Sequence, residues 1–190
     1  MKRKIINLLL WIYRVSVGIG LWSNRYFIAI FRFAYWRYKF ITDRNTLKFM
    51  KKNINDGDYV IDIGAMIGFY AHQLALNVGN SGCVYAFEPE KKNYTMLNEI
   101  LKKKRLDHRV LMINSAVSSS SGKISLTINN SHPADHHISI NQDLNSQLIN
   151  SVTLDEFFKD ITNRPIKFIK IDVQGHELEV LKGSEDLIKQ

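Results

Sequence analysis

The feature that most constrains the fold is a short apolar run that ends in an aspartate and a glycine turn. The stretch VIDIGAMIGFY (residues 60–70) places Asp62 inside such a run and Gly64 and Gly68 in the turn behind it. A second stretch, IKIDVQGHE (residues 169–177), repeats this order later in the chain. Short apolar runs bounded by turn residues are typical of buried strands in parallel sheets. Both stretches are therefore predicted to be strands whose carboxyl ends carry acidic side chains.

Strands and helices alternate in the first half of the globular part. The expected elements are a strand at 59–63, a helix at 69–78, a strand at 83–87, a helix from 89 to about 104, and a strand at 109–113. The helix at 69–78 is indicated by Leu74, Ala75 and Val78, which recur at helical spacing. This alternation is typical of an α/β fold, in which helices cover both faces of a parallel sheet.

The pattern changes after residue 121. The expected elements are an antiparallel strand at 122–128, a polar loop with one short strand at 129–147, a short helix after 153, a strand at 166–171 and a helix from 177. Thr153 and Glu156 have the spacing of a capping box, which predicts where the short helix begins. The second half therefore adds one more parallel strand and an antiparallel insertion.

Composition favours a globular protein, because 45% of the residues are apolar and 23% are charged. The one cysteine, Cys83, excludes an internal disulfide and fits a reducing compartment. Residues 1–52 carry twelve Lys and Arg and one acidic residue, a net charge of +11. Residues 53–190 carry fourteen Lys and Arg and seventeen acidic residues, a net charge of −3. A nucleic-acid surface spread over the fold is therefore not expected. We expect a basic, aromatic and helical arm at 1–52 and a globular domain at 53–190.

The arm has the composition of a membrane-contacting helix. Residues 5–22 are long enough to span a bilayer, but Arg14 at their centre costs about 2.5–3.5 kcal/mol on insertion. On helical geometry, basic residues share one narrow stripe with tryptophans beside it, namely Arg3, Arg14, Arg25, Arg32 and Lys39 with Trp11, Trp22 and Trp36. This pattern predicts peripheral membrane contact through residues 1–40. Packing onto the domain's own sheet, a signal peptide that ends near Gly18 and a true span remain as alternatives.

Acidic residues follow the predicted parallel strands. Asp62, Glu88 and Asp172 each lie at a strand end, and ligands bind at the carboxyl ends of such strands. The turn after Asp62 is not the dinucleotide fingerprint G-x-G-x-x-G, so a nicotinamide-dependent oxidoreductase is disfavoured. An aspartate beside a glycine turn suits an ammonium, and Glu88 can accept the hydroxyls of a ribose. S-adenosylmethionine carries both groups. The alternative is structural, with Asp62 as a helix cap and Glu88 solvated.

Five ordered blocks resemble the FkbM family of S-adenosylmethionine-dependent methyltransferases. They are VIDIGAMIGFY, VYAFEPE, NSAVSSSSG, TLDEF and IKIDVQGHELEVLKG, and the resemblance covers residues 54–183. It implies a class I methyltransferase sheet, which is Rossmann-like, and methylation of a hydroxyl on a glycan, a lipid-linked sugar or a natural product. The implied cofactor contacts are the methionine end at Asp62, Gly64 and Gly68, the ribose at Glu88, and the adenine near Ser115 and Ala116.

The same resemblance places Asp172 near the methyl group and the acceptor. Methyl transfer to a hydroxyl needs a group that removes its proton. Asp172 is the first candidate, and His176, near the start of the following helix, is the second. A capping or packing role for His176 stays open. The loop sequence HPADHH (residues 132–137) could bind a metal, but adjacent histidines project differently and no metal site is expected.

Two departures from the family pattern affect the expected function. Gln174 stands where the family most often has glutamate, and the chain stops at Gln190, in the helix after the fourth parallel strand. Further strands expected at the C-terminus are therefore missing, and the fourth strand would be an exposed edge that a partner, an oligomer or the arm covers. The expected protein is a cytoplasmic O-methyltransferase at the inner face of the membrane. The alternative is a truncated, catalytically silent remnant that binds the cofactor.

Overall fold

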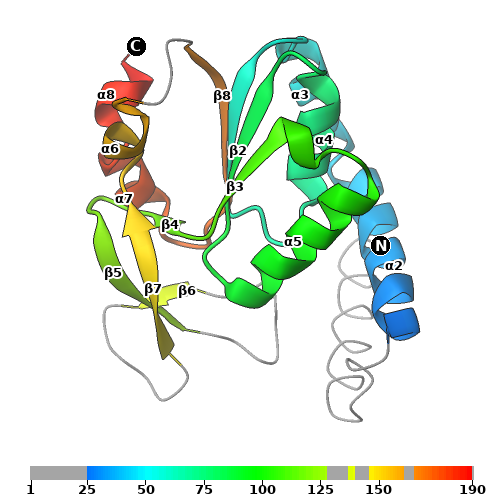
Figure 1. The fold of residues 1–190 in the computed structure, drawn as a ribbon, viewed down its shortest axis with the longest axis horizontal. Helices are drawn as coiled ribbons and strands as arrows, with labels where there is room; N and C mark the ends of the chain where they lie inside the picture. The colour runs from blue at the N-terminus through cyan, green and yellow to red at the C-terminus, as the bar shows by residue number, and fades with distance from the viewer. Residues whose placement is uncertain (1–24, 128–136, 140–145, 161–164, 190) are drawn as a thin grey trace.

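The structure, a computed structural model, describes residues 25–127, 137–139, 146–160 and 165–189. Its centre is a parallel sheet, with helices on both faces (Figure 1). The strands, in spatial order, are β3 (Val110–Ile113), β2 (Cys83–Phe87), β1 (Tyr59–Ile63) and β8 (Ile166–Ile171). Numbered as parallel strands along the chain, this order is 3-2-1-4, which is how a doubly wound α/β sheet begins. The predicted α/β fold with helices on both faces is confirmed.

Three helices cover one face of this sheet. They are α3 (Arg44–Asn53), α4 (Phe69–Asn77) and α5 (Lys91–Lys103). Val60 and Val84 of the strands point to this side, where they share a core cluster with Leu74, Leu97 and others. Because successive strand residues face opposite sides, the neighbours Ile61 and Tyr85 belong to the other face.

The opposite face is covered by shorter helices from the end of the chain. They are α6 (Leu154–Phe158), α7 (Glu177–Lys182) and α8 (Glu185–Ile188). Leu154, Val180 and Leu187, one from each helix, share a core cluster with Ile61 of β1. Thr153 caps α6, because its Oγ1 accepts a hydrogen bond of 3.1 Å from the backbone N–H of Glu156. The predicted start of this helix is confirmed.

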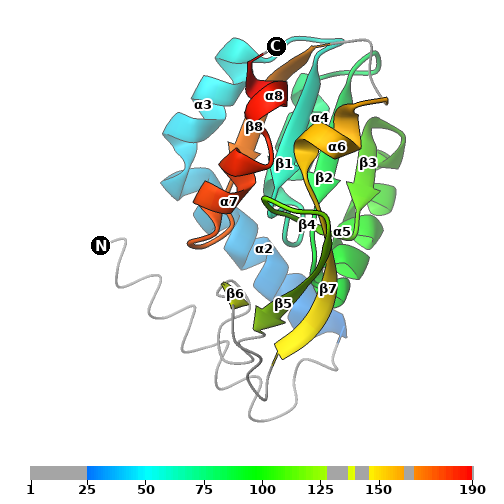
Figure 2. The ribbon, with the colours of Figure 1, turned by 90° about the vertical axis from the view of Figure 1, so that its left-hand side faces the viewer.

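A second sheet lies beyond the carboxyl ends of the central strands (Figures 1 and 2). Its strands, in spatial order, are β4 (Ala116–Val117), β7 (Ser146–Val152), β5 (Gly122–Thr127) and β6 (His137–Ser139). The antiparallel pairing of β5 was predicted, whereas β7 was not: its first two residues fell in the predicted polar loop, and no strand was predicted for the rest. Along β7, buried Ile149 and Ser151 alternate with exposed Leu148 and Asn150, which is the period of a strand with one solvated face. Residues 128–136 and 140–145 of the predicted loop lie outside the described residues.

The described part of the N-terminal arm packs on the domain. Helix α2 (Arg25–Thr42) crosses α4, where the Trp36 ring lies 5.6 Å from Phe69 and 5.0 Å from His72, centroid to centroid. Trp36 and Lys39 were predicted at a membrane boundary, but both face the domain. No helix among the described residues is long and apolar enough to cross a bilayer.

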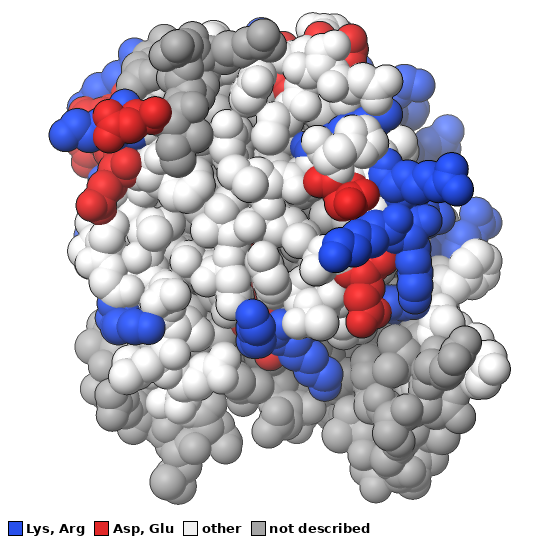
Figure 3. All heavy atoms as spheres, viewed as in Figure 1, with Lys and Arg blue, Asp and Glu red and all other residues white. Residues whose placement is uncertain are grey.

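Two surface features complete the fold. Basic side chains gather over α5 and the turn behind it, where residues 102–105 are exposed as expected for a solvated helix end (Figure 3). Strand β8 forms the edge of the central sheet, and no strand among the described residues pairs with its outer side. The η2 turn (Asp107–Arg109) links α5 to β3.

A matched pair of substitutions on α4 tests the core beneath the sheet. Leu74 is fully buried and Leu76, two residues later, is 51% exposed. Leu74→Ala should lower the free energy of unfolding by about 2–5 kcal/mol, because it leaves a cavity. Leu76→Ala should change it by less than about 0.5 kcal/mol. Urea denaturation measures both, and equal losses would contradict this packing.

Candidate active site

A cavity of about 290 Å³ opens at the carboxyl ends of the central strands. Among the residues that the sequence predicted to form the site, Gly64, Glu88, Ser115, Ala116 and Asp172 line it. The other predicted site residues, Asp62, Gly68 and His176, do not line it. The predicted crevice therefore exists, but its walls differ from the predicted set.

The glycine turn is required by the protein's own packing. Gly64 has φ +76° and Gly68 has φ +88°, values that favour glycine. A Cβ on Gly64 would lie 2.2 Å from the carbonyl oxygen of Asp172, and one on Gly68 would lie 2.4 Å from Cδ1 of Leu97. The first clash is with the residue that follows β8, and the second is with α5. Gly64 also borders the cavity, so a side chain at this position would obstruct both the protein's own packing and the cavity.

Asp62 lies beneath the cavity and meets a lysine of the neighbouring strand. Its side chain is fully buried, and Nζ of Lys170 lies 2.9 Å from its Oδ1. Lys170 is the register partner of Asp62 across the β1–β8 pair. No described residue donates a hydrogen bond of good geometry to either Asp62 oxygen, so the attraction is that of an ion pair. Asp62 was predicted to meet the ammonium of a ligand; the ammonium beside it is the protein's own.

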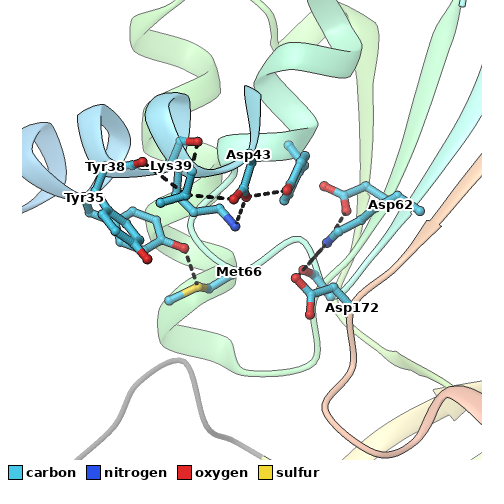
Figure 4. Close-up of polar contacts among 11 residues, drawn as sticks. Tyr35, Tyr38, Lys39, Asp43, Asp62, Met66 and Asp172 are labelled. Carbon is cyan, nitrogen blue, oxygen red and sulfur yellow. Dashed lines mark hydrogen bonds and ion pairs between the residues drawn. The ribbon is translucent and has the colours of Figure 1, made fainter. Parts of the chain in front are cut away.

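Lys170 links the ends of two strands. Besides Asp62, its Nζ donates to the carbonyl oxygen of Gly64 at 3.1 Å and lies 3.9 Å from Oδ2 of Asp172 (Figure 4). Asp172 is 58% exposed at its side chain, and its backbone N–H donates to the carbonyl of Ile63 at 3.1 Å. The carboxylate of Asp172 is therefore fixed at its base and open toward the cavity.

Helix α2 supplies a wall of the cavity through Tyr35 and Lys39. The Tyr35 hydroxyl lies 3.7 Å from Sδ of Met66 in the glycine turn, and Lys39 forms an ion pair with Asp43 (Figure 4). Asp43 in turn accepts a hydrogen bond of 2.5 Å from the Tyr70 hydroxyl. These contacts tie α2 to the turn that follows β1.

Both ammonium groups of the site lie close to the Tyr70 ring. Nζ of Lys39 is 4.8 Å and Nζ of Lys170 is 4.9 Å from its centroid, distances at which cations attract an aromatic ring. Burial, and next its hydrogen bond to Asp43, raise the pKa of Tyr70 well above the usual value. The phenol therefore stays protonated and remains a donor.

Glu88 lies at the end of β2 and is 5% exposed. Its Oε2 accepts from the backbone N–H of Met66 at 2.8 Å, and its Oε1 accepts from that of Glu90 at 3.0 Å. Met66 is held at φ +50°, an uncommon value for a residue with a side chain, and this contact helps to fix it. Burial raises the pKa of Glu88 to about 7.

The far end of the cavity is mostly apolar. It is formed by Phe87 of β2, Ser115 and Ala116 after β3, and Leu126 of β5. Ser115 is only 8% exposed, and Leu126 is 2% exposed. A planar, largely apolar group such as an adenine suits these walls.

His176 lies beside the cavity. Its Nε2 is 3.0 Å from Oγ of Ser118, and burial lowers its pKa. Gln174 lines the cavity at φ +51°. Among the described residues, no group of His, Cys, Asp and Glu could hold a metal ion. Most of the HPADHH loop lies outside the described residues.

Sequence reasoning missed Tyr35, Lys39, Tyr70 and Lys170. Lys170 could have been found, because it lies near the end of β8 and two residues before Asp172, a spacing that puts side chains on the same side of an extended chain. Nothing in the sequence placed Tyr35 and Lys39 at the site, since they come from the arm and depend on how α2 packs.

Comparison with known proteins identifies relatives of this chain. The sequence profile of the methyltransferase FkbM domain matches residues 62–190. A hexuronic acid methyltransferase, AglP of Haloferax volcanii, is 26% identical over 152 residues, which cover 77% of this chain and 58% of that protein. This chain thus spans little more than half the length of that relative.

Solved structures of methyltransferases also resemble the chain. The FkbM methyltransferase from Methylobacillus flagellatus matches 80% of this chain and 47% of its own, with 16% identity and a TM-score of 0.49. An rRNA methylase from Streptococcus thermophilus matches 76% of this chain and 61% of its own, with 14% identity and a TM-score of 0.47.

Removal of the Lys170 ammonium tests the buried ion pair. Lys170→Met leaves the Asp62 carboxylate buried without a cation and should lower the free energy of unfolding by about 3 kcal/mol or more. Lys167→Met, an exposed position on the same strand, should change it by less than about 0.5 kcal/mol. Adding Asp62→Asn to Lys170→Met should recover part of the loss in urea denaturation. If Lys170→Met is as stable as Lys167→Met, the ion pair is not what holds these strand ends.

Proposed function

The chain belongs to the FkbM methyltransferase family, and on that premise we propose that it transfers a methyl group from S-adenosylmethionine to a hydroxyl of a glycan or a lipid-linked sugar. The observation that carries the proposal is one cavity in which a glycine turn, a buried glutamate and an open aspartate meet at the ends of β1, β2 and β8. Ligands of open α/β sheets bind at this edge.

The walls of the cavity fit the three parts of this cofactor. Each carboxylate oxygen has two lone pairs, so Glu88, which accepts one backbone N–H at each oxygen and a hydrogen bond from the Asn93 side chain, can still accept from the ribose. Ser115 and Ala116 border the apolar end, which suits the adenine. Gly64 borders the opposite end, which suits the methionine part. In this proposal Gly68 shapes the turn, and Asp62 acts through Lys170 without touching the cofactor.

Asp172 is the proposed proton acceptor. When bound, the cofactor supplies an electrophilic methyl group. The chain must hold the acceptor hydroxyl about 3 Å from that carbon and take its proton as the new bond forms. Asp172 borders the cavity with an exposed carboxylate, and Lys170 lies 3.9 Å from it, close enough to keep it oriented. His176 is the weaker candidate, because its ring contacts Ser118 beside the cavity.

A sugar is the proposed acceptor class. The relative named above is a hexuronic acid methyltransferase, which supports a carbohydrate acceptor here. Tyr35 and Tyr70 border the cavity, and aromatic rings with a polar tip are suited to packing against sugars. We also propose that the protein is cytoplasmic. Its arm, residues 1–52 with a net charge of +11, would contact the inner face of the membrane.

Separate binding and transfer assays test this function. S-adenosylmethionine should raise the melting temperature of the wild type, and deuterated methyl should pass to a sugar of a cell-envelope extract, detected by mass spectrometry. Asp172→Asn should keep the melting shift and slow transfer by about 10²–10⁴-fold, because it removes the proton acceptor. His176→Asn should slow transfer by less than about tenfold. No melting shift in the wild type would refute the proposal, and equal transfer by Asp172→Asn would refute the role of Asp172.

The pH dependence of cofactor binding tests the role of Glu88. Its pKa is about 7 in the free protein, and only the ionised carboxylate has enough acceptor positions for its two backbone N–H donors and the ribose, because protonation turns one oxygen into a donor. Below pH 7 a proton must leave on binding, so the affinity should fall by up to about tenfold per pH unit, and above pH 8 it should be constant. Glu88→Gln should weaken binding about tenfold at pH 8 and flatten the profile. Glu99→Gln, exposed on α5, is the control. A wild-type profile as flat as that of Glu88→Gln in calorimetry would contradict this role.

A further inference from the structure

Helix α2 presents an apolar face to the outside. At about 100° per residue, its exposed side chains between residues 29 and 41 fall within an arc of about 120°. We call this the outward face: Ala29, Ile30, Phe33, Arg37 and Ile41. Phe40 lies in the same arc, but its ring packs on Phe69 of α4, with 5.1 Å between the centroids. Ile30, Phe33 and Ile41 are 68%, 70% and 69% exposed. A soluble monomer seldom leaves several large apolar side chains together in water, so this face marks an interaction surface.

The polar side of the same helix faces the protein. Lys39 forms its ion pair with Asp43 there, and the Tyr35 hydroxyl reaches Met66 (Figure 4). Trp36 packs on Phe69 of α4. Ile30, Phe33 and Ile41 thus point outward, although a surface helix normally turns its apolar residues inward. This orientation places polar side chains of α2 at the cavity wall and leaves the outward face exposed.

The charge around this face indicates its partner. The only acid in residues 25–53 is Asp43, and it is already paired with Lys39. Arg37 lies within the outward face, and the adjoining helix α3 exposes Arg44, Lys48, Lys51 and Lys52. Exposed apolar side chains among cations, with no acid free, match the boundary of a membrane that contains anionic lipid. We propose that the outward face of α2 docks on an anionic lipid bilayer.

Docking by this face would bring the cavity to the membrane. Tyr35 and Lys39 line the cavity from one side of α2, and the outward face is its other side. The cavity wall would then lie about one helix diameter, roughly 10 Å, from the lipid. This second step rests on the proposed function: the acceptor is a sugar carried on a membrane lipid, presented at the surface where α2 docks.

Vesicle co-sedimentation tests the docking surface in the full chain. The probes are vesicles of phosphatidylglycerol and phosphatidylcholine in equal parts, and vesicles of phosphatidylcholine alone. The wild type should bind the anionic vesicles, more weakly as salt increases. Ile30→Ser/Phe33→Ser should lower the affinity by about tenfold or more, because apolar contact is lost without any change of charge. Leu148→Ser, 61% exposed on β7, is the matched control and should bind like the wild type.

Each result bears on the proposal. Binding by Ile30→Ser/Phe33→Ser equal to that of the wild type would overturn it, as would wild-type binding that does not distinguish the two vesicles. A wild-type dimer in analytical ultracentrifugation that becomes monomeric in the double variant, with no vesicle binding, would assign the face to a second copy and also overturn it. The melting shift with S-adenosylmethionine, measured on the same variants, should be unchanged, and its failure would count against the proposed function alone.

Discussion

The ion pair between Lys170 and Asp62 is the interaction on which the rest of the site depends. It lies beneath the cavity and joins β8, the edge strand, to β1 at the point where both strands end. A fully buried carboxylate is unfavourable without a cation, so the position of Lys170 is closely constrained. The same ammonium donates to the carbonyl of Gly64 and lies 3.9 Å from Asp172, so it joins the glycine turn to the residue that follows β8.

The site also depends on the orientation of α2. Its polar residues are used at the cavity, through the Lys39–Asp43 pair, the Asp43–Tyr70 hydrogen bond and the contact of Tyr35 with Met66. Because a helix has only one inward side, Ile30, Phe33 and Ile41 are left outside. The catalytic and docking proposals therefore have a common physical origin in one helix, although their tests are independent.

The central sheet could be predicted from the sequence because its signals are local. The bounds of β1, β2 and β8 agree with the predicted strands, since short apolar runs end at turn residues. Strand β7 was missed because a polar strand with one solvated face has a weak local pattern and depends on distant β5. The Asp62–Lys170 pair depends on the strand register, and Tyr35 on how the arm packs. Neither is a property of local sequence.

The central claim is that the glycine turn, Glu88 and the segment after β3 hold one S-adenosyl ligand. A crystal structure with S-adenosylhomocysteine tests it most directly. The account predicts ribose hydroxyls within hydrogen-bond distance of the Glu88 carboxylate, the adenine beside Ser115 and Ala116, and Lys170 still paired with Asp62. A ligand bound away from this cavity, or a Glu88 carboxylate that contacts only the backbone of Met66 and Glu90, would contradict it.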